Sequence, residues 1–346
     1  MTQPDDTVRR TADDTVIDTA PLGTQWPTVD PFLFCAHHLD AYPVGDGELA
    51  PAVSLRGRSI GSDFAGVDGW NMYHGSRVPG FPQHPHRGFE TVTYVREGLI
   101  DHADSLGATA RFGQGDTQWV TAGNGIVHSE MFPLLSAENP NPLELFQIWL
   151  NLPAANKMVE PHFTMLWAQA TPVVHSDRAS VTVVTGEFAG HKPATPPDSW
   201  AARDDADVAI WHIRLDAGGT VDLPPAQSAA TVRTIYCFNG GAVRVGSTSV
   251  AQGTCAMVHS DRVCELTAGD EATECLVLQG RPIGEPVARY GPFVMNTQAE
   301  IHKAFDDYRR TEFGGWPWPT DDPTNGDAAV GRFARYPDGR YEFASV

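Results

Sequence analysis

Short strand-like segments follow one another through most of this chain, and their spacing constrains the fold more than any other feature. From about Pro31 onward, apolar or alternating runs are broken every ~8–12 residues by Gly, Pro, Asn or Asp, which is typical of antiparallel sandwiches and barrels. Examples are TVTYVREG, TQWVTAGNG and LELFQIWLNLP. The 33 glycines and 27 prolines supply turn residues and disfavour long helices. The chain is therefore predicted to be all-β.

The same order of strand, glycine turn and strand occurs twice. A second series begins near residue 180 and includes SVTVVTGEF, TVRTIYCFNGG and ECLVLQG. We interpret the two series as copies of one barrel plan, since 346 residues suffice for two domains of ordinary size. The predicted organisation is a flexible acidic N-terminal arm (1–28), an N-terminal barrel (29–150), a bridge (151–165), a C-terminal barrel (166–296), a helical segment (297–318) and a tail (319–346).

One helix is predicted, in the segment TQAEIHKAFDDYRR. Thr297 followed three residues later by Glu300 has the pattern of a capping box. The apolar residues that follow at helical spacing are Ile301, Ala304, Phe305 and Tyr308. We expect this helix to pack across a barrel rather than to carry function.

Charge and cysteine content exclude several classes of protein. The chain has 24 basic and 43 acidic residues, a net charge of -19, and no Lys/Arg cluster, so direct nucleic-acid binding is not expected. It has no run of 18 apolar residues and no apolar segment typical of a signal peptide, so we expect a cytoplasmic protein that does not span a membrane. The five cysteines include no CxxC pair and are expected to be buried, reduced thiols.

Candidate metal ligands appear in HPHRGFETVTYVREG. His84 and His86 stand two residues apart, so on a strand they share one face. If no bulge intervenes, Glu90, Val92 and Tyr94 share that face too. An HxH pair is weak evidence by itself, because strands at protein surfaces also carry such pairs.

A second pair, in GNGIVHSEM, strengthens the case. His128 and Glu130 again share one face, and the strand-turn units between the two pairs are enough to run round a barrel and return. Imidazole and carboxylate ligands together suit Fe(II), Mn(II), Ni(II), Cu(II) or Zn(II). His37 and His38 are adjacent and point to opposite faces, so they are poor co-ligands, and His74 is interpreted as a loop histidine.

These blocks resemble the pirin family of bicupins. Beyond HPHRGFETVTYVREG and GDTQWVTAGNGIVHSEM, the resemblance extends through PFLFCAHH, FQIWLNLPAANKM and GRPIGEPVARYGPFVMNTQAEIHKAFDDY, roughly residues 30 to 318. It implies two cupin (jelly-roll) β-barrels packed face to face, with a short C-terminal helix. It also implies one metal ion, usually iron as Fe(II), in the N-terminal barrel and none in the C-terminal barrel.

The resemblance further implies a set of site residues. The metal ligands would be His84, His86, His128 and Glu130. Glu90, a ligand in many other cupins, would instead lie beside the ligands and orient them by hydrogen bonds.

Two functions fit this family. Some pirin-like proteins resemble quercetinases, which open flavonols with O2; Glu130 would then be both ligand and catalytic base, taking the proton of the 3-hydroxyl group. Val92, Tyr94 and Trp119 are candidates for stacking the flat aromatic substrate, although ordinary core positions are commoner for such residues. Alternatively, the protein is a non-catalytic, metal- or redox-sensing regulator of a transcription factor or metabolic enzyme. The net charge of -19 would favour a basic protein partner.

Overall fold

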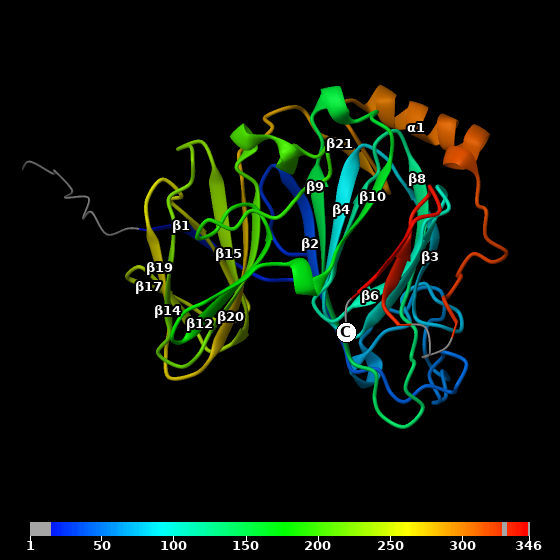
Figure 1. Cartoon of the computed structure of the whole chain (residues 1–346), viewed down its shortest axis with the longest axis horizontal. Helices are drawn as coiled ribbons and strands as arrows, with labels where there is room; N and C mark the ends of the chain where they lie inside the picture. Colours follow the sequence, from blue (N-terminus) through cyan, green and yellow to red (C-terminus); the bar gives the residue numbers. More distant parts are fainter. Residues whose placement is uncertain (1–14, 327–330, 345–346) are drawn as a thin grey trace, which may run out of the picture.

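The computed structural model describes residues 15–326 and 331–344 and shows two antiparallel β-barrels side by side (Figure 1). The described residues contain one α-helix, α1 (Gln298–Thr311), which lies beside the N-terminal barrel. The predicted all-β class, with two barrels and a short C-terminal helix, is confirmed.

The N-terminal barrel consists of a five-stranded and a six-stranded sheet. The five-stranded sheet has the order β10-β7-β4-β9-β2, and the six-stranded sheet has the order β24-β23-β6-β5-β8-β3. The strands of the first are β2 (Phe32–Asp40), β4 (Phe89–Glu97), β7 (Thr117–Thr121), β9 (Leu143–Asn151) and β10 (His162–Leu166). Those of the second are β3 (Gly80–His86), β5 (Leu99–Asp104), β6 (Thr109–Gly113), β8 (Ile126–Met131), β23 (Phe333–Arg335) and β24 (Tyr341–Phe343).

The C-terminal barrel has a seven-stranded sheet, β1-β18-β15-β20-β13-β12-β11, and a four-stranded sheet, β14-β19-β16-β17. The strands of the larger sheet are β1 (Val16–Pro21), β11 (Val173–His175), β12 (Ala179–Thr185), β13 (Ala209–Leu215), β15 (Val232–Gly240), β18 (Thr254–Val258) and β20 (Thr273–Gly280). Those of the smaller are β14 (Thr220–Leu223), β16 (Val243–Val245), β17 (Thr248–Val250) and β19 (Cys264–Ala268). Short 3-10 turns connect the strands: η1 (Val67–Gly69), η2 (Ala154–Asn156), η3 (Ala168–Ala170), η4 (Trp200–Ala202), η5 (Asp204–Ala206) and η6 (Glu312–Gly314).

The larger sheet of the C-terminal barrel packs on the five-stranded sheet of the N-terminal barrel. Val92 and Tyr94 of β4 belong to a hydrophobic core shared with Tyr236 and Leu276 of the other barrel. On the opposite face of β4, Val95 packs in the interior of its own barrel. Because both faces of β4 are covered, the strand is buried over most of its length.

The N-terminal arm differs from the prediction. Residues 1–14 lie outside the described residues, but from Val16 on the expected flexible arm is wrong, because β1 pairs antiparallel with β18 and joins the C-terminal barrel. On its other side β18 pairs with β15. Without β1, β18 would therefore be the edge strand of the seven-stranded sheet.

The predicted bridge and tail also contribute strands to the N-terminal barrel. β10, which begins inside the expected bridge, pairs with β7, and β23 of the tail pairs with β6. Beneath the tail, the buried Arg111 guanidinium forms an ion pair with Asp101 at 2.7 Å and donates to the carbonyl of Gly326 at 2.8 Å. The tail is thus an integral part of this barrel.

The segment after β20 leaves the C-terminal barrel earlier than predicted. Its hairpin, β21 (Ala288–Tyr290) and β22 (Phe293–Met295), packs with α1, and Phe293 forms a β-bridge with Arg87 of the N-terminal barrel. The predicted capping box of α1 is confirmed, with Thr297 and Glu300 in their expected roles.

All five cysteines are buried and free, as predicted. Within the described ranges, no helix is long and apolar enough to cross a membrane.

Candidate metal centre and its cavity

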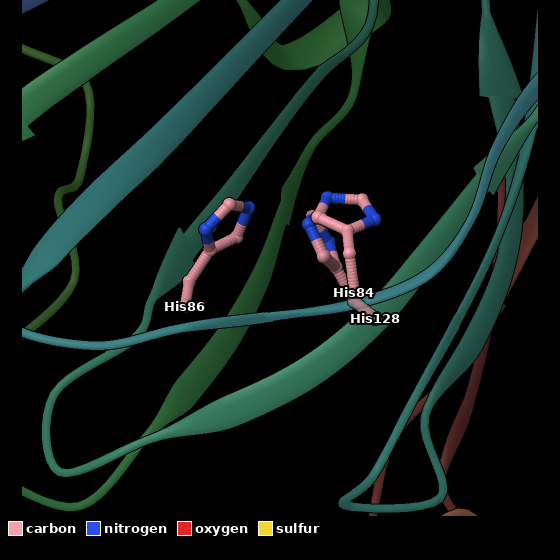
Figure 2. A group of neighbouring side chains, drawn as sticks. All are labelled: His84, His86 and His128. Atoms are coloured by element: carbon pink, nitrogen blue, oxygen red, sulfur yellow. The ribbon is translucent and has the colours of Figure 1, made fainter. Parts of the chain in front are cut away.

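Three imidazole rings from two strands meet inside the N-terminal barrel (Figure 2). β3 and β8 pair antiparallel with His84 opposite His128, and His86 follows two residues later on β3. The ring centroids lie 4.5 Å (His84 to His128), 4.8 Å (His84 to His86) and 4.9 Å (His86 to His128) apart. One potential ligand nitrogen of each ring lies within 4.8 Å of the other two. We call these residues the three-histidine cluster.

The hydrogen bonds of the cluster leave nitrogen lone pairs free for a metal. His84 Nδ1 lies 2.8 Å from the carbonyl oxygen of Pro82, and His86 Nδ1 lies 3.4 Å from that of Pro292. Because a carbonyl oxygen only accepts, each Nδ1 carries the proton and each Nε2 has a lone pair. His128 is fully buried, and neither of its ring nitrogens has a hydrogen-bond partner among the residues that the structure describes.

The protonation of the cluster also suits metal binding. Burial lowers the pKa of all three histidines, that of His84 to about 4, and keeps the rings neutral at pH 7. Buried polar atoms without partners are rare in folded proteins. The unpaired nitrogens of His128 therefore indicate that this donor set fits a metal ion, which would take the lone pairs that the protein leaves unused.

Glu130 lies close to the cluster on β8. Its buried carboxyl group accepts a hydrogen bond from Thr93 Oγ1 at 3.1 Å and lines the same cavity as His84 and His86. Burial raises the pKa of Glu130, an effect that the charge of nearby His102 opposes. Among the described residues, the set whose ligand atoms all approach within 4.8 Å does not include Glu130, so its role as a ligand stays a prediction.

Glu90 does not orient the predicted ligands by hydrogen bonds, so the role assigned to it is wrong. Its carboxylate accepts hydrogen bonds from Trp119 Nε1 at 3.0 Å, Thr121 Oγ1 at 2.8 Å and Ser199 Oγ at 2.6 Å. Burial raises the pKa of Glu90 to about 7, although these hydrogen bonds act in the opposite direction. Ser199 immediately precedes η4, in the connection between β12 and β13 of the C-terminal barrel. Its hydrogen bond to Glu90 therefore links the N-terminal barrel to this connection.

The turn between β3 and β4 explains this error. Gly88 has a φ of 83°, and a Cβ atom there would lie 2.0 Å from the carbonyl oxygen of Val294, so only glycine fits. This turn carries the chain from one sheet to the other and breaks the alternation counted from His84. On β4 it is Thr93 that faces the barrel interior and reaches Glu130.

The predicted substrate wall is wrong for the same reason. Val92, Tyr94 and Trp119 belong to the core between the two barrels. Tyr94 even reaches the second barrel, where its hydroxyl lies 3.2 Å from Nδ1 of His212. None of the three lines the cavity beside the three-histidine cluster.

Other aromatic residues line the cavity beside the three-histidine cluster. The cavity has a volume of about 790 Å³ and also contains His38 and Gln147 among its polar residues. It is of the size that holds small organic ligands in proteins. His74 lies at its edge, and its Nδ1 is 2.7 Å from the carbonyl oxygen of Gly61, as expected for a loop histidine. The aromatic side chains that line the cavity are Phe34, Phe64, Tyr73, Phe81, Phe132 and Trp149.

His102 is a buried histidine that the sequence reading missed. Its Nε2 lies 3.1 Å from Asp104 Oδ2, and its ring lies 5.6 Å from that of His128. The signal in the sequence was LIDHAD, where a histidine and an aspartate again stand two residues apart on one strand.

Comparisons with known proteins place this geometry in a family. The Pirin family model matches residues 17–150, and the Pirin C-terminal cupin domain model matches residues 210–314. A Pseudomonas aeruginosa protein named "Putative quercetin 2,3-dioxygenase" is 37% identical over 239 residues, which are 68% of this chain and 79% of the relative. Human pirin is 34% identical over 251 residues, 71% of this chain and 81% of the relative. The crystal structure of quercetin 2,3-dioxygenase from Acinetobacter baumannii superposes with a TM-score of 0.69 at 26% identity, covering 87% of this chain and 98% of that one.

Proposed function

The chain belongs to the pirin family, and from this premise we propose that it is a metal-dependent dioxygenase that opens flavonols such as quercetin with O2. The observation that supports the proposal most directly is the three-histidine cluster at an aromatic cavity that also contains a carboxyl group. The names of the Pseudomonas and Acinetobacter relatives support the same reaction.

In this proposal His84, His86 and His128 hold one divalent ion, with Fe(II) the first choice and Mn(II), Ni(II), Cu(II) or Zn(II) chemically compatible. When bound, the ion would supply a Lewis-acidic position for a substrate oxygen and the redox chemistry that O2 requires. The protein holds the ligand rings in place beforehand. The carbonyl oxygens of Pro82 and Pro292 orient two of them.

Glu130 is the proposed base of the reaction. The flavonol gives its 3-hydroxyl proton to a carboxylate oxygen of Glu130, and Thr93 holds that side chain toward the cavity. Burial raises the pKa of Glu130, which makes the carboxylate a stronger base for a weakly acidic hydroxyl group. The aromatic lining of the cavity covers the flat rings of the substrate and excludes water from the reacting atoms.

A turnover assay tests this proposal. The protein is loaded separately with each of the five metals, and the flavonol absorbance band is followed in air together with CO release. Loss of the band with CO release, abolished in His84→Ala and retained in His175→Ala, is the expected result. His175 is an exposed histidine of the other barrel and controls for the substitution itself.

The opposite outcome is equally informative. Absence of turnover with several flavonols and all five metals would contradict the enzyme proposal. It would favour the alternative, a metal-sensing regulator that binds a protein partner. Because this chain has a net charge of -19, the partner would be expected to have a basic surface.

A further inference from the structure

His38 and Tyr73 form a second polar feature of the cavity, away from the three-histidine cluster. His38 lies on β2, and its ring packs edge-on against Tyr73, at 5.0 Å between centroids, and Phe81, at 6.1 Å. The Phe81 ring also lies 6.4 Å from that of His84. Phe81 therefore contacts both His38 and His84, and all three side chains line the same cavity.

A chain of hydrogen bonds fixes the position of the proton on the His38 ring. The Tyr73 hydroxyl donates to Asp40 Oδ2 over 2.6 Å, and its oxygen lies 2.7 Å from His38 Nδ1. Because the single hydroxyl proton is directed at Asp40, the Tyr73 oxygen can only accept from His38, and Nδ1 carries the ring proton. The neutral ring then has its lone pair on Nε2.

This chain is anchored from behind. Asp40 is buried, and its Oδ1 accepts from the backbone nitrogen (2.8 Å) and side-chain nitrogen (3.0 Å) of Asn71. Tyr73 has a left-handed backbone with a φ of 56°, which is uncommon for an aromatic residue, and two backbone hydrogen bonds with Asp63 hold it there. Backbone strain retained beside a cavity is a recurrent property of functional sites. Burial and the neighbouring His37 lower the pKa of His38 to about 4, so the ring is neutral at pH 7.

The acceptor nitrogen of His38 has no partner within residues 15–326 and 331–344, although the residue lines the cavity. By contrast, Nε2 of the adjacent His37 lies 2.8 Å from Glu144. We propose that His38 is a specificity-determining residue whose Nε2 accepts a hydrogen bond from a hydroxyl group of a ligand bound in this cavity, other than the hydroxyl group that faces the three-histidine cluster. The ligand is then a planar polyphenol with at least one hydroxyl group besides the one at the three-histidine cluster. This inference rests on the proposed function and narrows its substrate class.

Two flavonols distinguish this contact from general aromatic binding. 3-Hydroxyflavone has only the hydroxyl group that would face the metal, whereas quercetin has four more. Binding is measured by calorimetry with zinc-loaded protein under argon, so that turnover does not interfere. We expect wild type to bind quercetin more tightly than 3-hydroxyflavone. In His38→Leu the ratio of the two dissociation constants should fall by about three- to tenfold, the effect of losing one hydrogen bond. Affinity for 3-hydroxyflavone and zinc content should not change, and the control His175→Leu should behave as wild type.

The possible failures are separable. If His38→Leu keeps the full preference for quercetin, the contact is wrong while the proposed function stands. If neither flavonol binds to wild type, both the proposed function and the contact are contradicted.

A second variant tests the orienting chain without relying on affinity alone. Tyr73→Phe removes the acceptor for His38 Nδ1–H, so the proton should move to Nε2, and the 15N chemical shifts of the His38 ring should report this change. The variant should also lose the preference for quercetin. Unchanged shifts and unchanged preference in Tyr73→Phe would overturn the role of the Asp40–Tyr73 pair.

Discussion

Replacing His128 with leucine should stabilise the metal-free protein and at the same time abolish its stabilisation by metal. The ring of His128 is fully buried, and in the described part of the chain neither of its nitrogens has a hydrogen-bond partner. A buried polar group without a partner costs about 1–3 kcal/mol, and leucine removes that cost at similar side-chain volume. We therefore expect the free energy of unfolding in EDTA to rise by about 1–2 kcal/mol.

Metal should reverse the order of stability. An ion that binds only the folded state at a concentration of 100 times its Kd adds about 2.7 kcal/mol to the free energy of unfolding of wild type. The variant lacks one of three imidazole ligands and should gain little. Urea unfolding of both proteins, with EDTA and with a divalent metal, measures the four free energies, and equal m-values confirm that the comparison is valid.

His212 supplies the matched control, because it is a buried histidine whose two ring nitrogens both have hydrogen-bond partners. Its Nε2 lies 2.8 Å from Glu274 and its Nδ1 lies 3.2 Å from the Tyr94 hydroxyl. His212→Leu removes both hydrogen bonds and should lower the free energy of unfolding by about 1–3 kcal/mol with or without metal. The reasoning is refuted if His128→Leu destabilises the EDTA-treated protein as much as His212→Leu does, or if metal stabilises His128→Leu as strongly as wild type.

Three further predictions concern the base, the contact between barrels and the tail. Glu130→Gln should reduce kcat far more than the metal content measured by mass spectrometry; equal loss of both would mean that the carboxylate is only a ligand. Glu274→Gln should lower the free energy of unfolding at pH 7 by about 1–2 kcal/mol after discounting for solvent screening, and urea titrations should show the difference vanish as the pH falls from about 4.5 to 2. The reason is that the pKa of Glu274 in the folded protein is lowered to about 2; burial acts to raise it, but the hydrogen bond from His212 and the charge of Arg96 outweigh burial. Deleting residues 331–346 should lower the melting temperature by several degrees and, because the edge of β6 is then exposed, cause self-association visible by light scattering; an unchanged monomer would contradict the structural role of the tail.

The sequence was informative wherever a pattern lay within one regular strand. His84 and His86 lie on β3 and His128 lies on β8, so counting alternate residues brought the three rings together correctly. The same count failed for Glu90, because the turn at Gly88 moves the chain to another sheet and no periodicity records such a change.

Other features were beyond sequence patterns for physical reasons. β1 pairs with a strand more than 200 residues away, and no local pattern identifies so distant a partner. β23 has only three residues, which is too short for a periodic signal. The left-handed backbone of Tyr73 depends on tertiary contacts with Asp63, and that conformation brings its hydroxyl to His38.

The exchange of terminal segments between the barrels affects how the chain can fold. β1 is synthesised first but needs β18, and the barrel that contains β6 is completed only when β23 arrives. Such distant pairings raise the contact order, and folding is slower when long loops must close before their contacts form. Every strand of the C-terminal barrel has been synthesised once residue 280 is reached, whereas the N-terminal barrel still lacks β23 at that point. We therefore expect the N-terminal barrel to mature last, which protease protection of stalled nascent chains would reveal.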